Sequence, residues 1–239
     1  MDFNRVLEEY GAAFTEAVRG RSAEPVPSCP GWTVEDLVAH LTVVQAWWTE
    51  VLLAGGPRPD EAAARAAADV GSDPFDSWLR VNARYLAVQR DSDPDGPAWT
   101  WWNPGELGTA AEVASRQVHE AVVHCWDARA AAGRQEPVPA AIAADGVDEF
   151  LSRLLVGPEW HGGPVAVGFR ATDADRTWLV ATDGTRPPAV TTGVEPTSLV
   201  TGTAEELYLV LWGRFPVERA VFAGDADAAH RVLDWQKLN

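Results

Sequence analysis

Three residues of this chain have the types and the spacing of a metal site: His40, Glu120 and His124. Glu120 and His124 are four residues apart in a segment with a helical pattern, so both side chains point to one face of that helix. His40 belongs to a second helical segment, far away in the sequence. Two imidazoles and one carboxylate on facing helices supply three protein ligands and leave a fourth position open. This is the ligand count of catalytic rather than structural zinc.

Spacing alone leaves a second interpretation open, in which the histidines are buried core residues whose ring nitrogens find other partners. Arg116, one turn before Glu120, is a candidate for binding an anionic substrate, or it forms an ordinary ion pair with Glu120. His119 lies about 140° around the helix from His124. We therefore expect His119 outside the ligand set, next to the ligands or in contact with a substrate. Cys125, beside His124, points to another face and is expected to be a small buried hydrophobe.

Composition excludes some classes of function. The formal charge of −16 and the pI near 4.6 argue against a nucleic-acid partner, since an acidic surface repels phosphates. No apolar run reaches the roughly 18 residues that span a bilayer, and the N-terminus lacks the pattern of a signal peptide. Two cysteines, Cys29 and Cys125, do not make a disulfide framework. We expect a cytoplasmic protein that does not act at a membrane.

Apolar spacing and capping signals predict the elements of secondary structure. The predicted helices cover residues 3–18, 33–54, 61–69, 74–90, 109–133, 140–155, about 203–212 and 226–238. The predicted strands cover residues 165–170, 178–182, 189–192 and 198–201. Residues 91–108 are expected to form a long loop. Tryptophans cluster at positions 47–48 and 99–102, where they either pack in the core or form an aromatic wall around a ligand pocket.

The Gly- and Pro-rich stretch 157–164 is the predicted domain boundary. It would separate a helical domain, residues 1–157, from a smaller α+β domain, residues 164–239. Four long amphipathic helices with one long connection are typical of a four-helix bundle. The predicted fold class is therefore α+β, with a helical bundle followed by a small α/β domain.

Three segments resemble one known family. Residues 29–41, CPGWTVEDLVAHL, resemble the GWT-x-x-DL-x-x-HL segment of actinobacterial mycothiol-dependent maleylpyruvate isomerase-like proteins, which belong to the DinB-like four-helix metalloproteins. Residues 116–127 are similar to that family's second ligand segment. Residues 209–214, followed by Gly224 and Asp225, resemble the family's C-terminal α/β domain, which is similar in fold to sterol carrier proteins.

The resemblance implies a divalent metal, usually zinc, held by His40, Glu120 and His124. It also implies mycothiol as the thiol cosubstrate, and a basic residue of the C-terminal domain, here Arg214, for an anionic group. The implied activity is that of a thiol S-transferase or cis–trans isomerase acting on a small electrophile, as a monomer or homodimer. Two alternatives stay open: a non-catalytic protein that binds metal or a small ligand on the same scaffold, and an interaction module without metal.

Overall fold

The computed structural model describes residues 1–71, 73–155, 157 and 159–235 of the chain. The chain forms two compact units, residues 1–136 and residues 137–239. The boundary comes earlier than the predicted stretch 157–164, because helix α6 (Ala140–Glu149) packs against α7 (Ala204–Leu211) of the second unit. Position 158 of that stretch lies outside the described residues, as does the predicted end of the last helix at residue 238.

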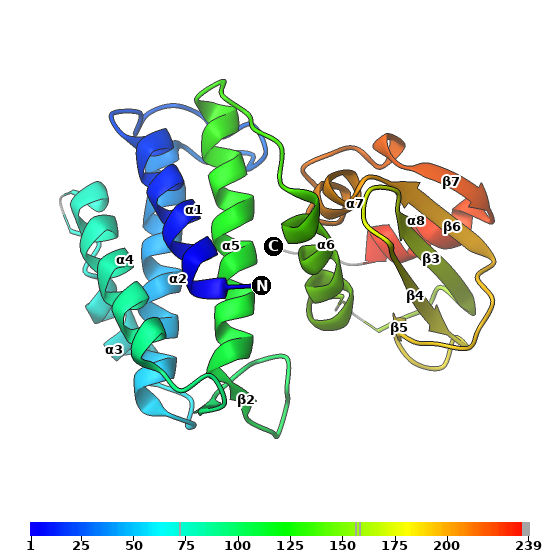
Figure 1. Ribbon diagram of the computed structural model, residues 1–239, viewed down its shortest axis with the longest axis horizontal. Helices are drawn as coiled ribbons and strands as arrows, with labels where there is room; N and C mark the ends of the chain where they lie inside the picture. Colours follow the sequence, from blue (N-terminus) through cyan, green and yellow to red (C-terminus); the bar gives the residue numbers. More distant parts are fainter. Residues whose placement is uncertain (72, 156, 158, 236–239) are drawn as a thin grey trace. The chain divides into compact units, whose positions relative to one another are not determined.

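The first unit is helical, as predicted (Figure 1). Its helices are α1 (Phe3–Val18), α2 (Val34–Ala54), α3 (Glu61–Ala68), α4 (Pro74–Asp91) and α5 (Ala110–Ala131). Helix α2 packs on α4, α1 packs on α5, and α2 also contacts α5. The long loop before α5 is closed by a short antiparallel pair that the sequence did not reveal, β1 (Pro97–Ala98) with β2 (Gly108–Thr109).

Reciprocal caps set the start of the two helices that carry the candidate ligands. The Thr33 hydroxyl accepts from the backbone of Asp36, and the Asp36 carboxylate accepts from the backbone of Thr33. Thr109 and Glu112 make the same arrangement at the start of α5. Each cap satisfies two backbone N–H groups that would otherwise lack partners. Glycine at residue 108 leaves room for this cap, because a Cβ there would lie 2.3 Å from a carboxylate oxygen of Glu112, which would have to shift.

The core of the first unit gathers apolar residues from all four long helices and from the loop before α2. Its buried members are Phe14, Val18, Val26, Val34, Leu37, Val38, Leu41, Trp78, Cys125 and Ala128. Burial of apolar surface on this scale supplies most of the free energy that holds such helices together. The sequence correctly assigned Cys125 to the core, where it is fully buried.

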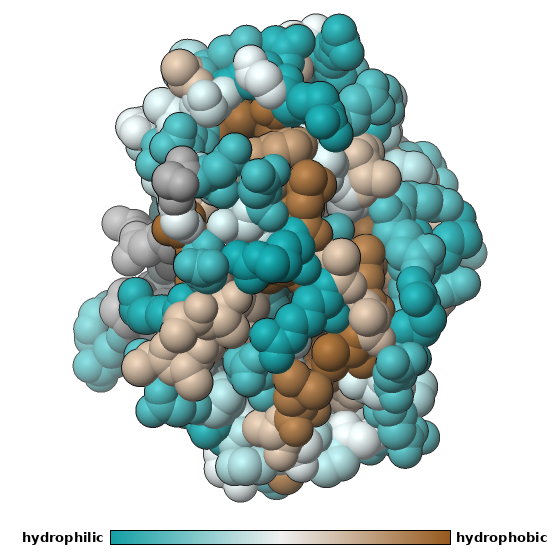
Figure 2. Space-filling model, turned by 90° about the vertical axis from the view of Figure 1, so that its left-hand side faces the viewer, coloured by the Kyte–Doolittle hydropathy of each residue, from teal (hydrophilic) through white to brown (hydrophobic). Residues whose placement is uncertain are grey.

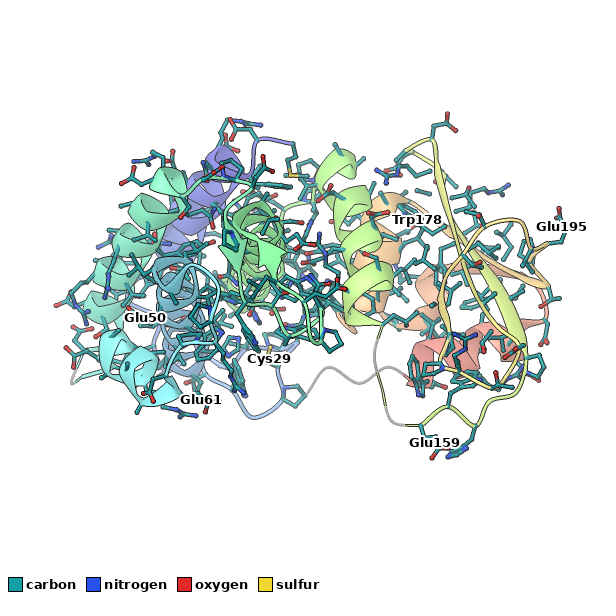
Figure 3. All side chains as sticks on the ribbon, turned by 90° about the horizontal axis from the view of Figure 1, so that it is seen from below. Cys29, Glu50, Glu61, Glu159, Trp178 and Glu195 are labelled. Carbon is teal, nitrogen blue, oxygen red and sulfur yellow. The ribbon has the colours of Figure 1, made fainter. Side chains whose placement is uncertain are left out.

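Helix α2 is the one described helix that is long and apolar enough to cross a membrane by length and composition. Half of its most apolar window is buried inside the protein, and Val51 and Leu37 are completely buried. Its apolar character therefore serves the packing of a bundle helix. Figure 2 shows one face of the molecule, on which hydrophilic residues surround narrow bands of hydrophobic ones. Side chains such as Glu50 of α2 and Glu61 of α3 contribute polar groups to the first unit (Figure 3).

The second unit is built on a mixed five-stranded sheet in the order β5–β4–β3–β6–β7. The strands are β3 (Val165–Ala171), β4 (Arg176–Thr182), β5 (Ala189–Val190), β6 (Ser198–Gly202) and β7 (Val221–Gly224). Among the described strand pairs of this sheet, β3 and β6 run parallel and the others run antiparallel. Helices α7 and α8 (Ala226–Trp235) pack on these two central strands. Helix α6 continues into a turn of π-helix, Phe150–Leu154, and a 3-10 turn, Val217–Arg219, precedes β7.

Candidate metal centre

Helices α2 and α5 bring His40, Glu120 and His124 together. One ligand atom from each residue lies within 4.8 Å of the other two. Glu120 Oε1 is 3.0 Å from His40 Nε2 and 3.3 Å from His124 Nε2. Ligand atoms about 2.0–2.1 Å from a tetrahedral ion are separated by roughly 3.3 Å. The donor types and these two separations therefore fit one divalent ion.

The Glu120 carboxylate divides its two oxygens between different partners. Oε1 faces the imidazoles, and Oε2 forms an ion pair with the Arg116 guanidinium. Both side chains are almost fully buried. A buried carboxylate is stable only when its charge is compensated, and Arg116 provides that compensation from one turn earlier on α5. The ion pair that the sequence offered as the alternative role of Arg116 is thus present. Its use in substrate binding stays a prediction.

A buried carboxylate orients His124 from the opposite side. The Asp127 carboxylate accepts a hydrogen bond from His124 Nδ1 at 2.9 Å, which turns Nε2 toward Glu120 and leaves it as the nitrogen that can bind a metal ion. Asp127 is completely buried and is itself held by the hydroxyl of Ser28, with the Cys29 thiol 3.7 Å away. Histidine ligands of metal sites commonly donate to such a carboxylate.

His40 lies on the more open side of the group. Its side chain is 34% exposed, against 11% for Glu120 and 9% for His124. The Trp32 ring is tilted against the His40 ring, with 5.1 Å between their centroids, and the His124 ring meets His40 edge-on at 5.0 Å. The imidazole of His40 is therefore held between two rings, while solvent reaches the group from its side.

The electrostatics favour a positive charge between these ligands. Burial alone would raise the pKa of Glu120, yet Arg116 and the hydrogen bonds from both histidines hold that pKa well below its usual range. Burial alone would lower the pKa of His124, yet hydrogen bonds to Asp127 and Glu120 raise it above its usual range. The same surroundings that retain a proton on an imidazole also stabilise a bound cation.

The other predicted site residues lie apart from the three convergent ligand atoms. His119 is fully buried on α5 and is not one of the converging group. Direct contact between His119 and a substrate would need the surrounding side chains to move. Arg214 lies in the second unit, just after α7, where its guanidinium donates to the Trp212 carbonyl at 2.8 Å. The roles proposed for both residues stay predictions.

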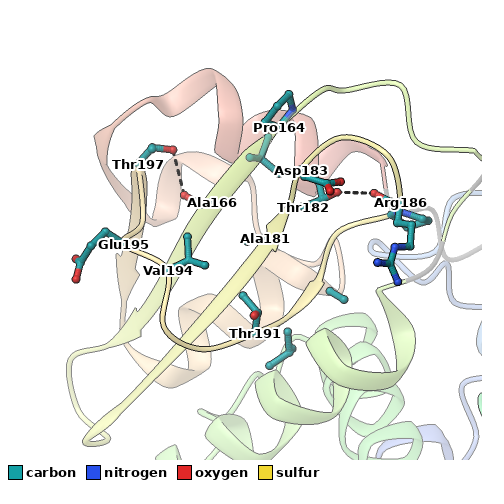
Figure 4. A pocket seen from close by; sticks show the side chains of 14 residues that line it. Pro164, Ala166, Ala181, Thr182, Asp183, Arg186, Thr191, Val194, Glu195 and Thr197 are labelled. Carbon is teal, nitrogen blue, oxygen red and sulfur yellow. Dashed lines mark hydrogen bonds between the residues drawn. The ribbon is translucent and has the colours of Figure 1, made fainter.

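The second unit has a cavity of its own, of about 680 Å³, on the sheet formed by β3, β4 and β5 (Figure 4). The Thr182 hydroxyl donates to the Arg186 carbonyl at 2.6 Å, and the Thr197 hydroxyl donates to the Ala166 carbonyl at 3.2 Å. These contacts stabilise the loops that border the cavity. No group of three metal-ligating side chains occurs among its described residues.

Comparison with known proteins assigns the family. Residues 5–129 match the mycothiol maleylpyruvate isomerase N-terminal domain, and residues 141–231 match the C-terminal domain of the same family. The chain belongs to the mycothiol-dependent maleylpyruvate isomerase family. The two matched ranges meet near the boundary between the two compact units, which places α6 with the C-terminal domain of this family.

Solved structures show the same fold. One is a crystal structure of the mycothiol-dependent maleylpyruvate isomerase, and another is a histidine-to-alanine mutant under the same enzyme name. Each matches with a TM-score of 0.65 and 13% identity, over 93% of this chain and 92% of the other. No curated protein matches by sequence. The likeness at this identity concerns the fold: a helical N-terminal domain followed by an α/β domain.

Sequence analysis missed the groups that support the ligands. Asp127 lies inside the segment 116–127, but its role depends on Ser28, which is 99 positions away. Trp32 stands inside the motif that contains His40, eight residues earlier, and the ring contact between them appears only once the loop before α2 is folded. The available signal was the three-residue spacing from His124 to Asp127.

Proposed function

We propose that His40, Glu120 and His124 hold a divalent metal ion, zinc in the first instance, and that the protein is a metal-dependent enzyme. Its substrates would be a low-molecular-weight thiol, mycothiol, and a small electrophile. The observation that carries the proposal is the convergence of two imidazole nitrogens and one carboxylate oxygen within 4.8 Å. Membership of the family supports mycothiol as the thiol.

Each supporting side chain has a defined task in this proposal. Asp127 keeps the proton of His124 on Nδ1 and leaves Nε2 as the ligand atom. Arg116 holds Glu120 Oε2, so that Oε1 faces the imidazoles. Trp32 fixes the orientation of the His40 ring. A divalent ion at this position would supply one chemical effect, which is to lower the pKa of a bound thiol and so provide thiolate at neutral pH.

Two reactions follow from such a thiolate. Addition to an electron-poor double bond forms a carbon–sulfur bond and leaves a carbon–carbon single bond that is free to rotate. Elimination of the thiol after rotation restores the double bond in the other geometry, as in a cis–trans isomerase. If the thiol is retained and a proton is taken up, the same site is an S-transferase. The proposal covers both outcomes with one set of side chains.

A reducing compartment suits this chemistry, since neither Cys29 nor Cys125 is part of a disulfide in the described structure and the cosubstrate is itself a thiol. We propose that the protein works in the cytoplasm, on small molecules, as a monomer or homodimer.

The test is a pair of measurements on the same purified chain. Zinc-loaded protein is incubated with mycothiol and a panel of activated double bonds, and both thiol consumption and product geometry are followed. We expect activity that a chelator removes, that zinc restores, and that is absent from His40→Ala. One bound metal ion per chain without thiol-dependent turnover would contradict the proposed enzyme activity and would indicate a metal-binding protein. Turnover that survives a chelator would contradict the proposal that the activity depends on a metal ion.

A further inference from the structure

The first unit has a cavity that is lined by tryptophan side chains. It has a volume of about 360 Å³, within the range of small-molecule sites. Trp47 and Trp48 reach it from α2, and Trp99 and Trp101 reach it from the loop between β1 and β2. The Trp47 and Trp99 rings meet edge to face, with 5.8 Å between centroids and 87° between planes. Tryptophans of both clusters therefore line a cavity, as one sequence interpretation expects, while the buried Trp48 also packs in the core, as the other expects.

This pocket, which we call the tryptophan pocket, begins next to the candidate metal centre. Val43 and Val44 line it, and they lie three and four residues after His40, one turn along α2. Trp47 lies about 10 Å along the helix from His40 and within about 20° of the same face. The side chains of His40, Val43, Val44 and Trp47 are all at least partly exposed, so they form a continuous accessible stripe on α2. A ligand in the pocket would lie within one or two turns of His40.

The charges around the pocket are positive, although the whole chain carries −16. The pocket includes two arginines, Arg58 and Arg65, and one acid, Glu61. The Arg58 guanidinium lies 5.2 Å from the Trp99 ring centre and 5.8 Å from that of Trp47, and it forms an ion pair with Glu61. Arg65 forms no ion pair with any of the described residues. One guanidinium is thus available for a ligand.

These features select a class of ligand. Flat aromatic walls favour a planar conjugated group, because ring edges and faces attract one another. A free guanidinium beside them favours a carboxylate, since charge-assisted hydrogen bonds are roughly twice as strong as neutral ones. A ligand whose carboxylate is conjugated with its ring offers a partner to both kinds of side chain. A neutral sugar would use the tryptophans but would gain little from the charge of Arg65.

We propose that the tryptophan pocket binds a planar aromatic carboxylate, with its ring against Trp47 and Trp99 and its carboxylate on Arg65. We further infer that this group is the non-reacting part of the electrophile. That second step rests on the proposed function, whereas binding to the pocket does not depend on any metal.

Calorimetric titration of the full chain in a chelator tests the binding step. The probes are trans-cinnamate and its neutral amide, cinnamamide, with methyl glucoside as the sugar probe. We expect saturable binding of cinnamate, with affinity at least about tenfold above that of cinnamamide, from the loss of a charge-assisted bond. Trp99→Ala and Arg65→Gln should each weaken cinnamate binding by a similar factor. Arg231→Gln, an exposed arginine of the second unit, is the matched control and should change nothing.

Arg65 is exposed, so its substitution leaves the fold intact even if Trp99→Ala does not. Equal binding of cinnamate and cinnamamide, tighter binding of methyl glucoside, or insensitivity to Arg65→Gln would each overturn the proposed ligand. Because these titrations contain a chelator, they stand even if the metal proposal fails.

In metal-loaded protein, Arg65→Gln should raise the KM for an aryl-substituted electrophile about tenfold and leave the KM for the thiol unchanged. An unchanged KM for the electrophile would overturn the link to the reaction.

Discussion

Asp127 accepts a hydrogen bond from His124 Nδ1 at 2.9 Å in the interior of the first unit. This single contact determines which nitrogen of His124 faces Glu120 and His40. Asp127 is completely buried, and its other oxygen is held by Ser28 from the loop before α2. The two segments that carry the candidate ligands are therefore tied together behind the site as well as at it.

Replacing Asp127 with asparagine is expected to weaken metal binding. An amide can donate to Nδ1, which allows the proton of His124 to move to Nε2 and block the ligand atom. We expect the dissociation constant for zinc to rise about 10–100-fold, measured by competition with a chromogenic chelator. Asp95→Asn, in the exposed loop before α5, is the control and should bind zinc like the parent protein. An unchanged constant in Asp127→Asn would refute the orienting role.

Glu120 and Arg116 are expected to stabilise the protein only as a pair. Glu120→Gln removes the carboxylate that pairs with the buried Arg116 guanidinium, and we expect a loss of about 3–5 kcal/mol in the free energy of unfolding. Denaturant unfolding in a chelator measures this loss apart from any metal effect.

The double variant Glu120→Gln/Arg116→Gln separates charge from packing. It removes both charges, so we expect it to be more stable than the sum of the two single losses predicts, by at least about 1 kcal/mol. Simple additivity of the single variants would show that the ion pair contributes no coupling.

A side chain at Gly108 is expected to destabilise the protein. A Cβ at this position would lie 2.3 Å from Glu112 and 2.8 Å from Thr100, at the cap that begins α5. We expect Gly108→Ala to cost about 1–3 kcal/mol in thermal or denaturant unfolding, since either the cap or the loop must shift. Gly71→Ala is the control, because a Cβ there meets only one atom, at 3.9 Å. Equal stability of the two variants would contradict this account of the cap.

Cys125 is expected to be unreactive in the folded protein. It is fully buried, and burial raises the pKa of its thiol to about 11, so roughly one molecule in a thousand carries the thiolate at pH 8. Because the thiolate forms as pH rises through the folded pKa, reactivity should stay low until the pH approaches that value.

The Cys29→Ala variant isolates Cys125 for this measurement with a disulfide reagent. We expect the remaining thiol to react only after denaturation. Rapid reaction of the folded variant at pH 8 would show that Cys125 is accessible, and it would contradict the burial of this thiol.

Local signals in the sequence predicted most of the fold. The capping residues Thr33 and Thr109 placed the starts of both ligand helices within one residue of the structure. Strand β7 was missed because its residues are mostly exposed and it pairs at the edge of the sheet, so burial imposes no alternating pattern on it. The predicted boundary, 157–164, lies after the observed one, between residues 136 and 137. No sequence feature shows which unit an amphipathic helix such as α6 packs against.

The residues of the candidate site could be predicted from the sequence only in part. The i, i+4 spacing placed Glu120 and His124 on one face, His40 on a second predicted helix completed the donor set, and the resemblance to a family implied that the three bind one metal ion. Contacts that join residues far apart in sequence could not be predicted, such as Ser28 with Asp127 and Trp48 with Trp102. Such contacts depend on how α2, α5 and their loops pack together, which the periodicity of a single segment does not contain.

The most direct test of the account is the metal content of the folded chain. Wild-type protein and His40→Ala are each loaded with zinc, freed of excess ion and analysed for zinc per chain, with circular dichroism to establish that both are folded. We expect one zinc ion per wild-type chain and far less than one in His40→Ala, because two remaining ligands hold an ion weakly. A wild-type chain without zinc, or a folded His40→Ala that retains one full equivalent, would contradict a centre built from His40, Glu120 and His124.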